Sequence, residues 1–481
     1  MTAVKSALRP ATAILVILAA FLANGCRVAN RAEGPPPPLL LVSMDGFRWD
    51  YPALHPAETP TIHELIRTGI SASEMIPVYP SNTFPNHYAI ATGLYPAHNG
   101  IVNNDMFDPK FGAVFQYTLP VDNGDGRWWG GEPIWVTAVK QGRKSAANYW
   151  VGSEAPIEGI RPTYFKPFQM AVYQKQSFDD RIDEIVGWLK LPPDQRPAIV
   201  TCYLEETNSV GHKFGPDSKE IVSAVRMLDA RLGALLARLK AEHIPVNVVL
   251  VSDHGMTNVS PDRVMVIDDY VDLRTVQVDF QSPAVGLRPL QGTAQDLVRA
   301  LAKLPHAKAY LTDNQPPPPG LAGVGHWLSV NVLHRGEYLP ARFHLTNNLR
   351  IPDVWIVPEE GWHVQTRATS KVPADNEQIF CSAFCRSDLS ERANSRSTSR
   401  CFCICSLRLR NVSSARLSWS FDRTSSIVRS VTRFSRDVLS RRISSSASLR
   451  LEMSRYTIES TVRLPKGTAV ITTSSGNSVP S

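Results

Sequence analysis

The stretch LLLVSMDGF, Leu39 to Phe47, begins as an unbroken apolar run and ends at an acidic residue, Asp45. A short apolar run of this kind is typical of a strand buried on both faces, as in a parallel sheet. A second run, VNVVLVSDHGM from Val246 to Met256, ends in Asp253 and His254. Because functional groups collect beyond the carboxyl ends of strands in open α/β sheets, both carboxylates are predicted to meet at one place.

Strand and helix patterns alternate through the middle of the chain. Helices are predicted at Thr61 to Thr68, Phe178 to Leu189 and about Ser218 to His243, and strands at Ala198 to Leu204 and Val246 to Ser252. Further elements, at Val264 to Val271, Ala294 to Leu304, Trp327 to Val332 and Val354 to Val357, are expected to extend the pattern. The alternation predicts a doubly wound α/β fold, with a mostly parallel sheet and helices on both faces.

The stretch SNTFPNHYAIATG, Ser81 to Gly93, places a hydroxyl side chain, Thr83, at the start of a predicted helix. Pro85 suits a first helical turn, and Gly93 suits the end of the helix. A helix N-terminus offers N–H donors and a partial positive charge, so an anionic phosphate near Thr83 would be stabilised there. Thr83 is therefore a candidate nucleophile, and the alternative is that it only caps the helix.

A third apolar run, AIVTCYLEETNSVGHKFGP from Ala198 to Pro216, is predicted to be a strand followed by a loop that carries His212. With Asp45, Asp253, His254 and Thr83, this loop would bring carboxylate, imidazole and hydroxyl oxygen to the strand ends. These are the ligand types of a hydrolytic two-metal site.

Taken together, the motifs resemble the nucleotide pyrophosphatase/phosphodiesterase family, or type I phosphodiesterases, within the alkaline phosphatase superfamily. The matching motifs are the Asp45-Gly46 strand end, TFPNHY with ATGLYPAHNGI, the E-E-x-x-S-x-G-H-x-x-G-P loop, and VSDHGM. The resemblance runs from about Leu39 to about Ser370. It implies an alkaline-phosphatase-like fold and a hydrolase with two zinc ions, whose threonine is transiently nucleotidylated.

The resemblance also implies a role for each matching residue at the metal centre. One zinc would be bound by Asp45, Asp253 and His254 together with the oxygen of Thr83. Zinc lowers the pKa of a bound hydroxyl, so Thr83 would be the nucleophile that attacks phosphorus.

The substrate-binding residues follow from the resemblance in the same way. Asn104, in GIVNND, matches the residue that donates to a phosphate oxygen beside the threonine. Tyr164 in RPTYF and Tyr203 in CYLEE match aromatic residues that face the nucleobase, and an aromatic face is a suitable platform for a base. The segment Phe107 to Trp135, which contains three tryptophans, is expected to be mostly a packed surface loop.

The chain departs from the family pattern at the second zinc. Asn208 stands where an Asp is expected, and an amide oxygen is a weaker zinc ligand than a carboxylate. His212 remains, but the family's final ligand, in a His-Gly pair beyond about Ser370, is absent. Neither His344 nor His363 is expected to replace it. One firmly bound zinc, a weak or empty second site and impaired hydrolysis are therefore predicted.

Three functions stay open from these residues. The motifs favour hydrolysis of phosphodiester or pyrophosphate bonds in nucleotides, whereas Asn208 and the tail favour a catalytically inactive binding protein of the same fold. The third is a related phosphomonoesterase or sulfatase. A sulfatase would need Cys or Ser in C/S-x-P-x-R, which SNTFPN does not match.

The N-terminus is typical of an export signal. Residues 1–26 contain Lys5 and Arg9, an apolar run from Ala11 to Ala23, and Gly25-Cys26. Cys26 is a candidate for lipid attachment, which predicts a periplasmic protein or a membrane-anchored lipoprotein. Residues 27–38 end in four prolines and are expected to form a stiff linker to the catalytic domain, residues 39–370.

Residues 371–481 differ in composition from the rest. From Cys381 onward there are 26 Ser and 16 Arg, and basic residues exceed acidic ones by 11, so the basic pI of about 9.0 belongs to the tail. It therefore does not indicate a nucleic-acid-binding domain. The CFCIC motif lacks the C-x2-C pairs of a zinc site. The tail is interpreted as frameshifted or disordered, and it is expected to lie outside the folded domain.

Overall fold

The computed structural model of the protein describes residues 36–169, 173, 175–281, 283–312 and 338–368, and three short strands near the C-terminus. The chain divides into residues 1–37 and 38–481, and every helix and strand below belongs to the second unit. The expected export signal and Cys26 lie outside the described residues, so export and lipid attachment stay predictions. Among the described helices, none has both the length and the apolar character needed to cross a membrane.

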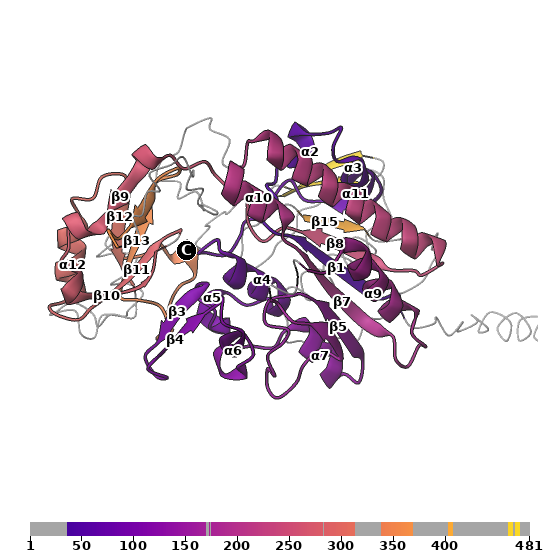
Figure 1. Ribbon diagram of the computed structural model, residues 1–481, viewed down its shortest axis with the longest axis horizontal. Coiled ribbons are helices and arrows are strands. Elements are labelled where there is room, and N and C mark those ends of the chain that lie inside the picture. The colour runs from indigo at the N-terminus through magenta and orange to yellow at the C-terminus, as the bar shows by residue number, and fades with distance from the viewer. Residues whose placement is uncertain are drawn as a thin grey trace, which may run out of the picture. The chain divides into compact units, whose positions relative to one another are not determined.

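A seven-stranded sheet forms the centre of the fold (Figure 1). Its strands, in spatial order, are β2 (Ile70–Ser71), β15 (Cys403–Ser406), β8 (Asn247–Val251), β1 (Leu39–Met44), β7 (Pro197–Leu204), β5 (Lys144–Asn148) and β6 (Tyr164–Lys166). The five strands from β8 to β6 are parallel. Leu40, Val42 and Met44 are fully buried, as predicted for a central strand covered on both faces.

Helices cover both faces of this sheet. One face packs against α3 (Pro60–Thr68), α9 (Phe178–Lys190) and α11 (Lys219–Ala241), and the other packs against α4 (Thr83–Thr92) and α7 (Ile134–Lys140). The apolar stripe of α11 faces the sheet, and its members are Ile221, Val225, Leu228, Leu232, Leu235 and Leu239. The predicted doubly wound α/β fold is therefore confirmed. Short helices complete the domain: α2 (Tyr51–Leu54), α5 (Pro96–Asn99), α6 (Pro120–Asn123) and α10 (Glu206–Phe214).

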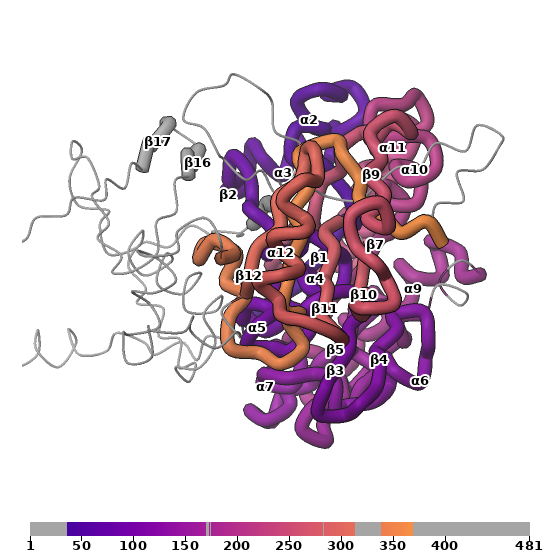
Figure 2. Tube along the Cα trace, turned by 90° about the vertical axis from the view of Figure 1, so that its left-hand side faces the viewer, coloured from indigo at the N-terminus to yellow at the C-terminus, as the bar shows by residue number. Residues whose placement is uncertain are grey.

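A separate antiparallel sheet follows along the chain, and it includes the element predicted at Val354 to Val357. Its strand order is β10 (Val276–Phe280), β11 (Val285–Pro289), β13 (Val354–Pro358) and β12 (Ala307–Leu311), and α12 (Ala294–Leu301) packs against it (Figure 2). β9 (Val264–Val266) pairs with β14 (His363–Gln365) in a parallel ladder of its own. The elements predicted at Val264 to Val271, Ala294 to Leu304 and Val354 to Val357 are present as β9, α12 and β13. Apolar runs in the sequence do not reveal that distant strands pair in a second sheet. The strand expected at Trp327 to Val332 lies outside the described residues.

The segment from Phe107 to Trp135 is more ordered than the surface loop that the sequence suggested. It contains the hairpin β3 (Asp105–Asp108) and β4 (Ala113–Gln116). Trp128, Trp129 and Trp135 are at most 4% exposed and belong to the core beside α4 and α7. The loop prediction is therefore wrong for these tryptophans, whose large apolar surface is stabilised by burial.

Part of the tail takes part in the fold. β15 pairs antiparallel with β8 on one side and with β2 on the other, inside the large sheet. β16 (Ser460–Leu464) and β17 (Gly467–Ile471) form a hairpin. The expectation of a tail outside the domain is thus wrong for Cys403–Ser406. This segment forms backbone hydrogen bonds with the edge of β8 that faces away from β1. The rest of the tail lies outside the described residues, and its frameshift origin stays a prediction.

A buried arginine ties the segment before β13 to the hairpin region. Arg350 Nε donates to Asp108 Oδ2 at 2.6 Å, and its Nη1 donates to the carbonyl oxygens of Gly100 and Trp128 at 2.9 and 2.6 Å. The guanidinium also lies over the rings of Trp128 and Phe111. Because both charges of the pair are largely buried, removal of one leaves the other without compensation.

We predict that Arg350→Met lowers the free energy of unfolding by about 3–5 kcal/mol, the range for breaking a buried pair from one side. Arg299→Met, which removes an exposed pair with Asp296, is the matched control and should have little effect. Chemical denaturation of both variants measures this difference. Equal, small losses for the two arginines would show that Arg350 does not clamp the fold.

Candidate active site and metal centre

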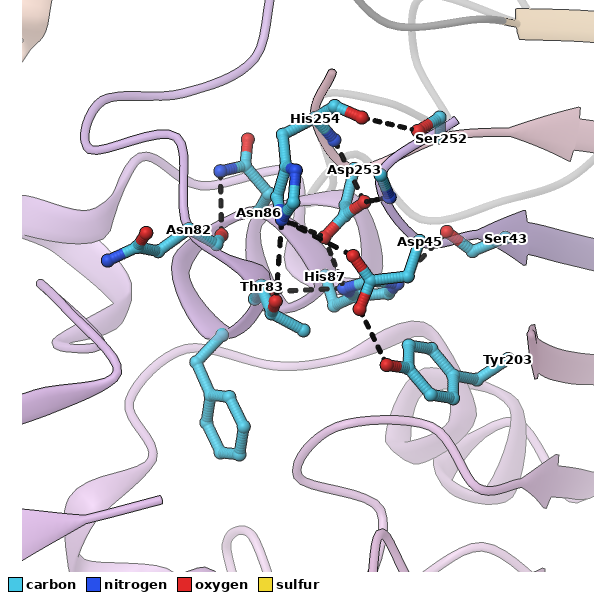
Figure 3. Close-up of polar contacts among 12 residues, drawn as sticks. Ser43, Asp45, Asn82, Thr83, Asn86, His87, Tyr203, Ser252, Asp253 and His254 are labelled. Carbon is cyan, nitrogen blue, oxygen red and sulfur yellow. Dashed lines mark hydrogen bonds and ion pairs between the residues drawn. The ribbon is translucent and has the colours of Figure 1, made fainter. Parts of the chain in front are cut away.

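Two carboxylates and an imidazole converge at the carboxyl ends of neighbouring parallel strands (Figure 3). Asp45 follows β1, and Asp253 and His254 follow β8. His254 Nε2 lies 3.3 Å from Asp45 Oδ1 and 3.2 Å from Asp253 Oδ2. All three residues are at most 1% exposed. The sheet therefore brings them together as the sequence predicted.

Each carboxylate is held by one oxygen and presents the other to His254. Asp45 Oδ2 accepts a hydrogen bond from the Tyr203 hydroxyl at 2.6 Å. Asp253 Oδ1 accepts from the backbone N–H groups of Gly46 and His254, at 3.1 and 2.8 Å. The remaining oxygens, Asp45 Oδ1 and Asp253 Oδ2, have no hydrogen bond of good geometry from the described part of the chain. Hydrogen-bonded carboxylates of this kind are typical of metal sites.

The tautomer of His254 leaves three electron-pair donors, Asp45 Oδ1, Asp253 Oδ2 and His254 Nε2, in a position to bind a cation. Its Nδ1 lies 3.0 Å from the carbonyl oxygen of Gly255, which can only accept a hydrogen bond, so Nδ1 carries the proton. Nε2 then presents a lone pair to two carboxylate oxygens. When both carboxylates are ionised, three acceptors meet here with no proton between them, and a positive ion stabilises them. Within the described residues, Asp45, Asp253 and His254 are the one group of at least three His, Cys, Asp or Glu side chains able to hold a metal ion.

The pKa values of the two carboxylates also indicate that a positive ion is needed between them. Burial raises the pKa of Asp45 well above its usual value, and the adjacent charge of Asp253 adds to this. Burial also opposes ionisation of Asp253, but the positive charges that His254 and His87 carry when protonated, together with the Gly46 N–H, outweigh it and lower the pKa of Asp253 to about 2. Two buried carboxylates this close are costly to ionise together unless a cation joins them.

Thr83 lies beside this group at the start of α4. Its Oγ1 is 3.4 Å from His254 Nε2, and the residue is partly exposed. Asn82, with an extended backbone, is the N-cap, so Thr83 stands inside the first turn. The helix-cap alternative for Thr83 therefore does not describe its place here. The helix N-terminus adds the favourable potential for an anion that the sequence analysis anticipated.

Asn104 is anchored beside the same turn. Its Oδ1 accepts a hydrogen bond from the backbone N–H of Phe84 at 3.0 Å. Asn103 fixes the neighbouring backbone, because its Oδ1 accepts from Asn82 Nδ2 and from the Asn104 N–H, at 2.6 and 2.7 Å. With its oxygen engaged, the amide NH2 of Asn104 is left as the donor next to Thr83.

The residues expected at a second metal are arranged differently. Asn208 and His212 lie in the helix α10, where the sequence analysis expected a loop. Asn208 packs on the turn after Asp45, since a Cβ added to Gly46, whose φ is +67°, would come within 3.0 Å of the Asn208 Cα. Asn208 Oδ1 is buried and has no hydrogen-bond partner in the described ranges. His212 belongs to no second group of three His, Cys, Asp or Glu side chains able to hold a metal ion among those residues.

The two histidines considered as replacements lie in other elements. His344 ends a 3-10 turn, Ala341–Phe343, and stacks on Tyr95 with ring centroids 3.9 Å apart. His363 begins β14. These placements give no support for either histidine as a second-site ligand.

The two tyrosines expected to face a base have other positions. In the register of the sheet, Tyr164 on β6 pairs with Ala146 on β5. Ala146 pairs with Val200 on β7, and Val200 pairs with Leu40 near the start of β1. Its hydroxyl donates to the carbonyl of Gln195, before β7 begins. Tyr164 is therefore at the amino end of the sheet, far from Asp45, and this corrects the prediction. The position of Tyr164 is determined by the register between β5 and β6, which the sequence does not reveal.

Tyr203 is at the site but not as a base platform. Its ring is 2% exposed and packs edge-on against Phe168 and His87. A ring so buried offers no open face for stacking, so the structure gives it the role of orienting Asp45 instead. Tyr117, which is 37% exposed, contacts the ring of Phe84, the residue after Thr83. Sequence reasoning missed it because the β3–β4 segment was not recognised as part of the site.

Fold and site together define an α/β protein with a buried Asp-Asp-His metal-site candidate and a hydroxyl at the adjacent helix N-terminus. The chain belongs to the type I phosphodiesterase/nucleotide pyrophosphatase family, whose sequence profile matches residues 39–382. The family assignment that the motifs predicted is confirmed.

Individual relatives agree with this assignment. A venom phosphodiesterase of Macrovipera lebetinus is 35% identical over 362 residues, which cover 71% of this chain and 38% of the relative. Human ectonucleotide pyrophosphatase/phosphodiesterase family member 1 is 41% identical over 271 residues, covering 55% of this chain and 29% of the relative. The chain thus spans about two-fifths or less of the length of these two relatives.

Solved structures match over most of the chain. Murine ectonucleotide pyrophosphatase/phosphodiesterase 5 has a TM-score of 0.62 and 28% identity, covering 76% of this chain and 87% of that one. An inactive variant of the same protein, with a threonine replaced by alanine and in complex with AMP, has a TM-score of 0.64 and 28% identity, covering 77% and 88%. The fold of this family is therefore shared.

A buried acid lies behind the aromatic side of the site. Glu154 is 8% exposed, and its carboxyl oxygens have no hydrogen-bond partner of good geometry among the described residues. Burial raises its pKa to about 8, although the N–H groups of Glu154 and Phe168 act in the opposite direction. Phe168 packs in turn on Phe84, the residue after Thr83. The uncharged form of Glu154 is therefore favoured at neutral pH.

We predict that Glu154→Gln changes how stability depends on pH. Because the pKa of Glu154 is higher in the folded protein than the usual value of about 4.3, the folded state binds a proton that the unfolded state lacks between these values. Wild-type stability should fall there by up to about 1.4 kcal/mol per pH unit as pH rises, and stop changing above about pH 8. Glu154→Gln has no carboxyl group at this position, so its stability should not show this fall with pH.

Unfolding free energies of the wild type and Glu154→Gln, measured from about pH 5 to 9, test this. Glu158→Gln, at a carboxylate that is 49% exposed, is the control and should follow the wild type. A constant difference between wild type and Glu154→Gln across the range would contradict the raised pKa.

Proposed function

We propose that this chain hydrolyses phosphodiester or pyrophosphate bonds of nucleotides, with Thr83 as the nucleophile. The proposal rests mainly on the position of Thr83 Oγ1, which lies at the N-terminus of α4 and 3.4 Å from His254 Nε2. Membership of the family and the activity named for its venom relatives support the proposal. The murine variant described above, inactive after loss of a threonine, also supports it.

The chain's own residues suggest how the phosphate is bound. The backbone N–H of Thr83 in the first turn of α4 and the amide NH2 of Asn104 donate hydrogen bonds to the equatorial phosphate oxygens. Phe84 N–H is already bonded to Asn104 Oδ1, which fixes the direction of that amide. Tyr117 offers the exposed ring on which a base or an aromatic leaving group would stack. A substrate placed in this way has its phosphorus beside Thr83.

The reaction has two steps at Thr83. The oxygen of Thr83 attacks phosphorus, a bond from Oγ1 to phosphorus forms, and the bond to the leaving-group oxygen breaks, so that the leaving group departs with the proton that Thr83 gives up. Water then attacks the same phosphorus, the Oγ1 bond breaks, and the hydroxyl regains its proton while the nucleotide leaves. The intermediate is a nucleotide linked to Thr83.

We propose Zn²⁺ as the ion that Asp45, Asp253 and His254 hold, because two carboxylates and an imidazole beside a hydroxyl form a four-ligand set typical of zinc. Zinc bound there would lower the pKa of the Thr83 hydroxyl and supply positive charge near the phosphate. The orientation of both carboxylates by Tyr203, Gly46 and the His254 N–H supports this ligand set.

The described residues do not fit a second zinc. Asn208 offers a neutral amide, and His212 is not within a group of three metal ligands there. We therefore propose slow turnover, and the same observation favours a second candidate function, a nucleotide-binding protein of this fold without hydrolysis. The two differ in whether nucleotide bound beside Thr83 is converted.

We predict that Thr83→Ala abolishes hydrolysis of p-nitrophenyl thymidine monophosphate, because no other described hydroxyl is placed against His254 Nε2 in this way. Thr83→Ser keeps the oxygen and should retain turnover. If Thr83 served only to stabilise the helix, the alanine variant would instead keep its activity. Release of p-nitrophenolate is the measurement.

Equal turnover of wild type and Thr83→Ala would refute the nucleophile. Binding of AMP without turnover of the diester by the wild type would favour the binding protein. Calorimetric titration with AMP, carried out on wild type and Thr83→Ala, separates these outcomes.

A further inference from the structure

We infer that His87 is a positioning residue, which holds Asp253 and the Thr83 turn in a fixed relation and so sets the metal affinity of the Asp45–Asp253–His254 group. This inference rests on the proposed function, because it concerns the metal group and nucleophile proposed there. His87 is completely buried and lies one helical turn after Thr83 in α4.

His87 contacts both halves of the site through one nitrogen. Its Nδ1 lies 2.9 Å from the carbonyl oxygen of Thr83 and 3.3 Å from Asp253 Oδ2 (Figure 3). Its Nε2 lies 2.9 Å from Ser43 Oγ on β1. One imidazole thus joins the first turn of the nucleophile helix, the metal-facing oxygen of Asp253 and the strand that ends in Asp45.

The partners determine which nitrogen carries the proton. The Thr83 carbonyl and the Asp253 carboxylate can only accept hydrogen bonds, so Nδ1 carries the proton: it donates to the Thr83 carbonyl oxygen, and Asp253 Oδ2 lies 3.3 Å from the same nitrogen. In the neutral ring Nε2 is then an acceptor, and the Ser43 hydroxyl can donate to it. His87 and His254 therefore have the same tautomer but opposite tasks: His254 turns its lone pair toward Asp253 Oδ2, whereas His87 turns a proton toward the same oxygen.

Packing prevents the ring from leaving this position. It lies edge-on to Trp150 and Tyr203, with centroids 5.2 and 5.1 Å away. Trp150 Nε1 also donates to the His87 carbonyl oxygen at 3.3 Å. Because Tyr203 donates to Asp45 Oδ2, the ring of His87 touches the residue that orients the other carboxylate. A change at His87 therefore reaches both carboxylates without touching substrate.

The energetic consequence falls on metal binding. Asp253 Oδ1 is fixed by two backbone N–H groups, but Oδ2, the oxygen that faces His254, is approached by one N–H donor, that of His87. Loss of a group that orients a metal ligand typically weakens metal affinity by about 10–100-fold. We expect a loss of this size when the Nδ1 donor is removed.

Two substitutions separate the Nδ1 donor from the bulk of the ring. In His87→Asn the amide nitrogen takes the place of Nδ1, whereas in His87→Gln it takes the place of Nε2. Zinc affinity of chelator-stripped protein, measured by competition with a chromophoric chelator, should fall about 10–100-fold in His87→Gln and be largely retained in His87→Asn. Ser43→Ala removes the Nε2 partner and should keep the wild-type zinc affinity.

The outcomes are distinct. Equal zinc affinity in His87→Gln and the wild type, or the same loss in the Asn and Gln variants, would overturn the inference and leave His87 a packing residue. Zinc binding is measured without substrate, so a wild type that binds zinc but hydrolyses nothing would refute the proposed function and leave this inference intact.

A second test uses the wild type and does not depend on whether His87→Gln folds. ¹⁵N NMR of histidine-labelled protein should show a neutral ring protonated at Nδ1, identified by its loss in His87→Asn, with a resonance that shifts when zinc is added. A His87 ring protonated at Nε2, or one unaffected by zinc, would contradict the inference.

Discussion

The site depends on one electrostatic constraint: two buried carboxylates and an imidazole lone pair meet, and when both carboxylates are ionised there is no proton between the three groups. Asp45 Oδ1 and Asp253 Oδ2 both lie within 3.3 Å of His254 Nε2. The hydrogen bond from Nδ1 to the Gly255 carbonyl excludes a proton on Nε2 in the neutral ring. An arrangement of three acceptors is stable in a protein interior when a cation joins them, and this requirement links the fold to the proposed chemistry.

The sheet produces this constraint through the ends of its strands. β8, β1 and β7 are parallel neighbours, so Asp253, Asp45 and Tyr203 reach the same edge from three separate parts of the sequence. The helix α4 then approaches with its N-terminus, and His87 ties that helix to Asp253. Thr83 thus reaches the metal group through a short helix that is held at both its cap and its first turn.

The fold class and the first metal group could be predicted because they depend on local patterns. Apolar runs that end in Asp45 and Asp253 are visible in the sequence, and parallel strands bring such ends together. Positions that depend on register or on distant pairing could not be predicted. Tyr164 lies at the wrong end of the sheet because of the register between β5 and β6, and the antiparallel sheet of β10 to β13 pairs strands that are far apart in sequence.

The most direct test of the account is to locate and count zinc in the purified protein, by metal analysis together with anomalous diffraction from crystals. We predict about one firmly held zinc per chain, coordinated by Asp45, Asp253 and His254, with the Thr83 oxygen as its fourth protein ligand. A protein that retains no zinc after dialysis, or zinc bound elsewhere, would contradict the metal group. Two tightly bound zinc ions would contradict the proposal that Asn208 and His212 do not form a second site.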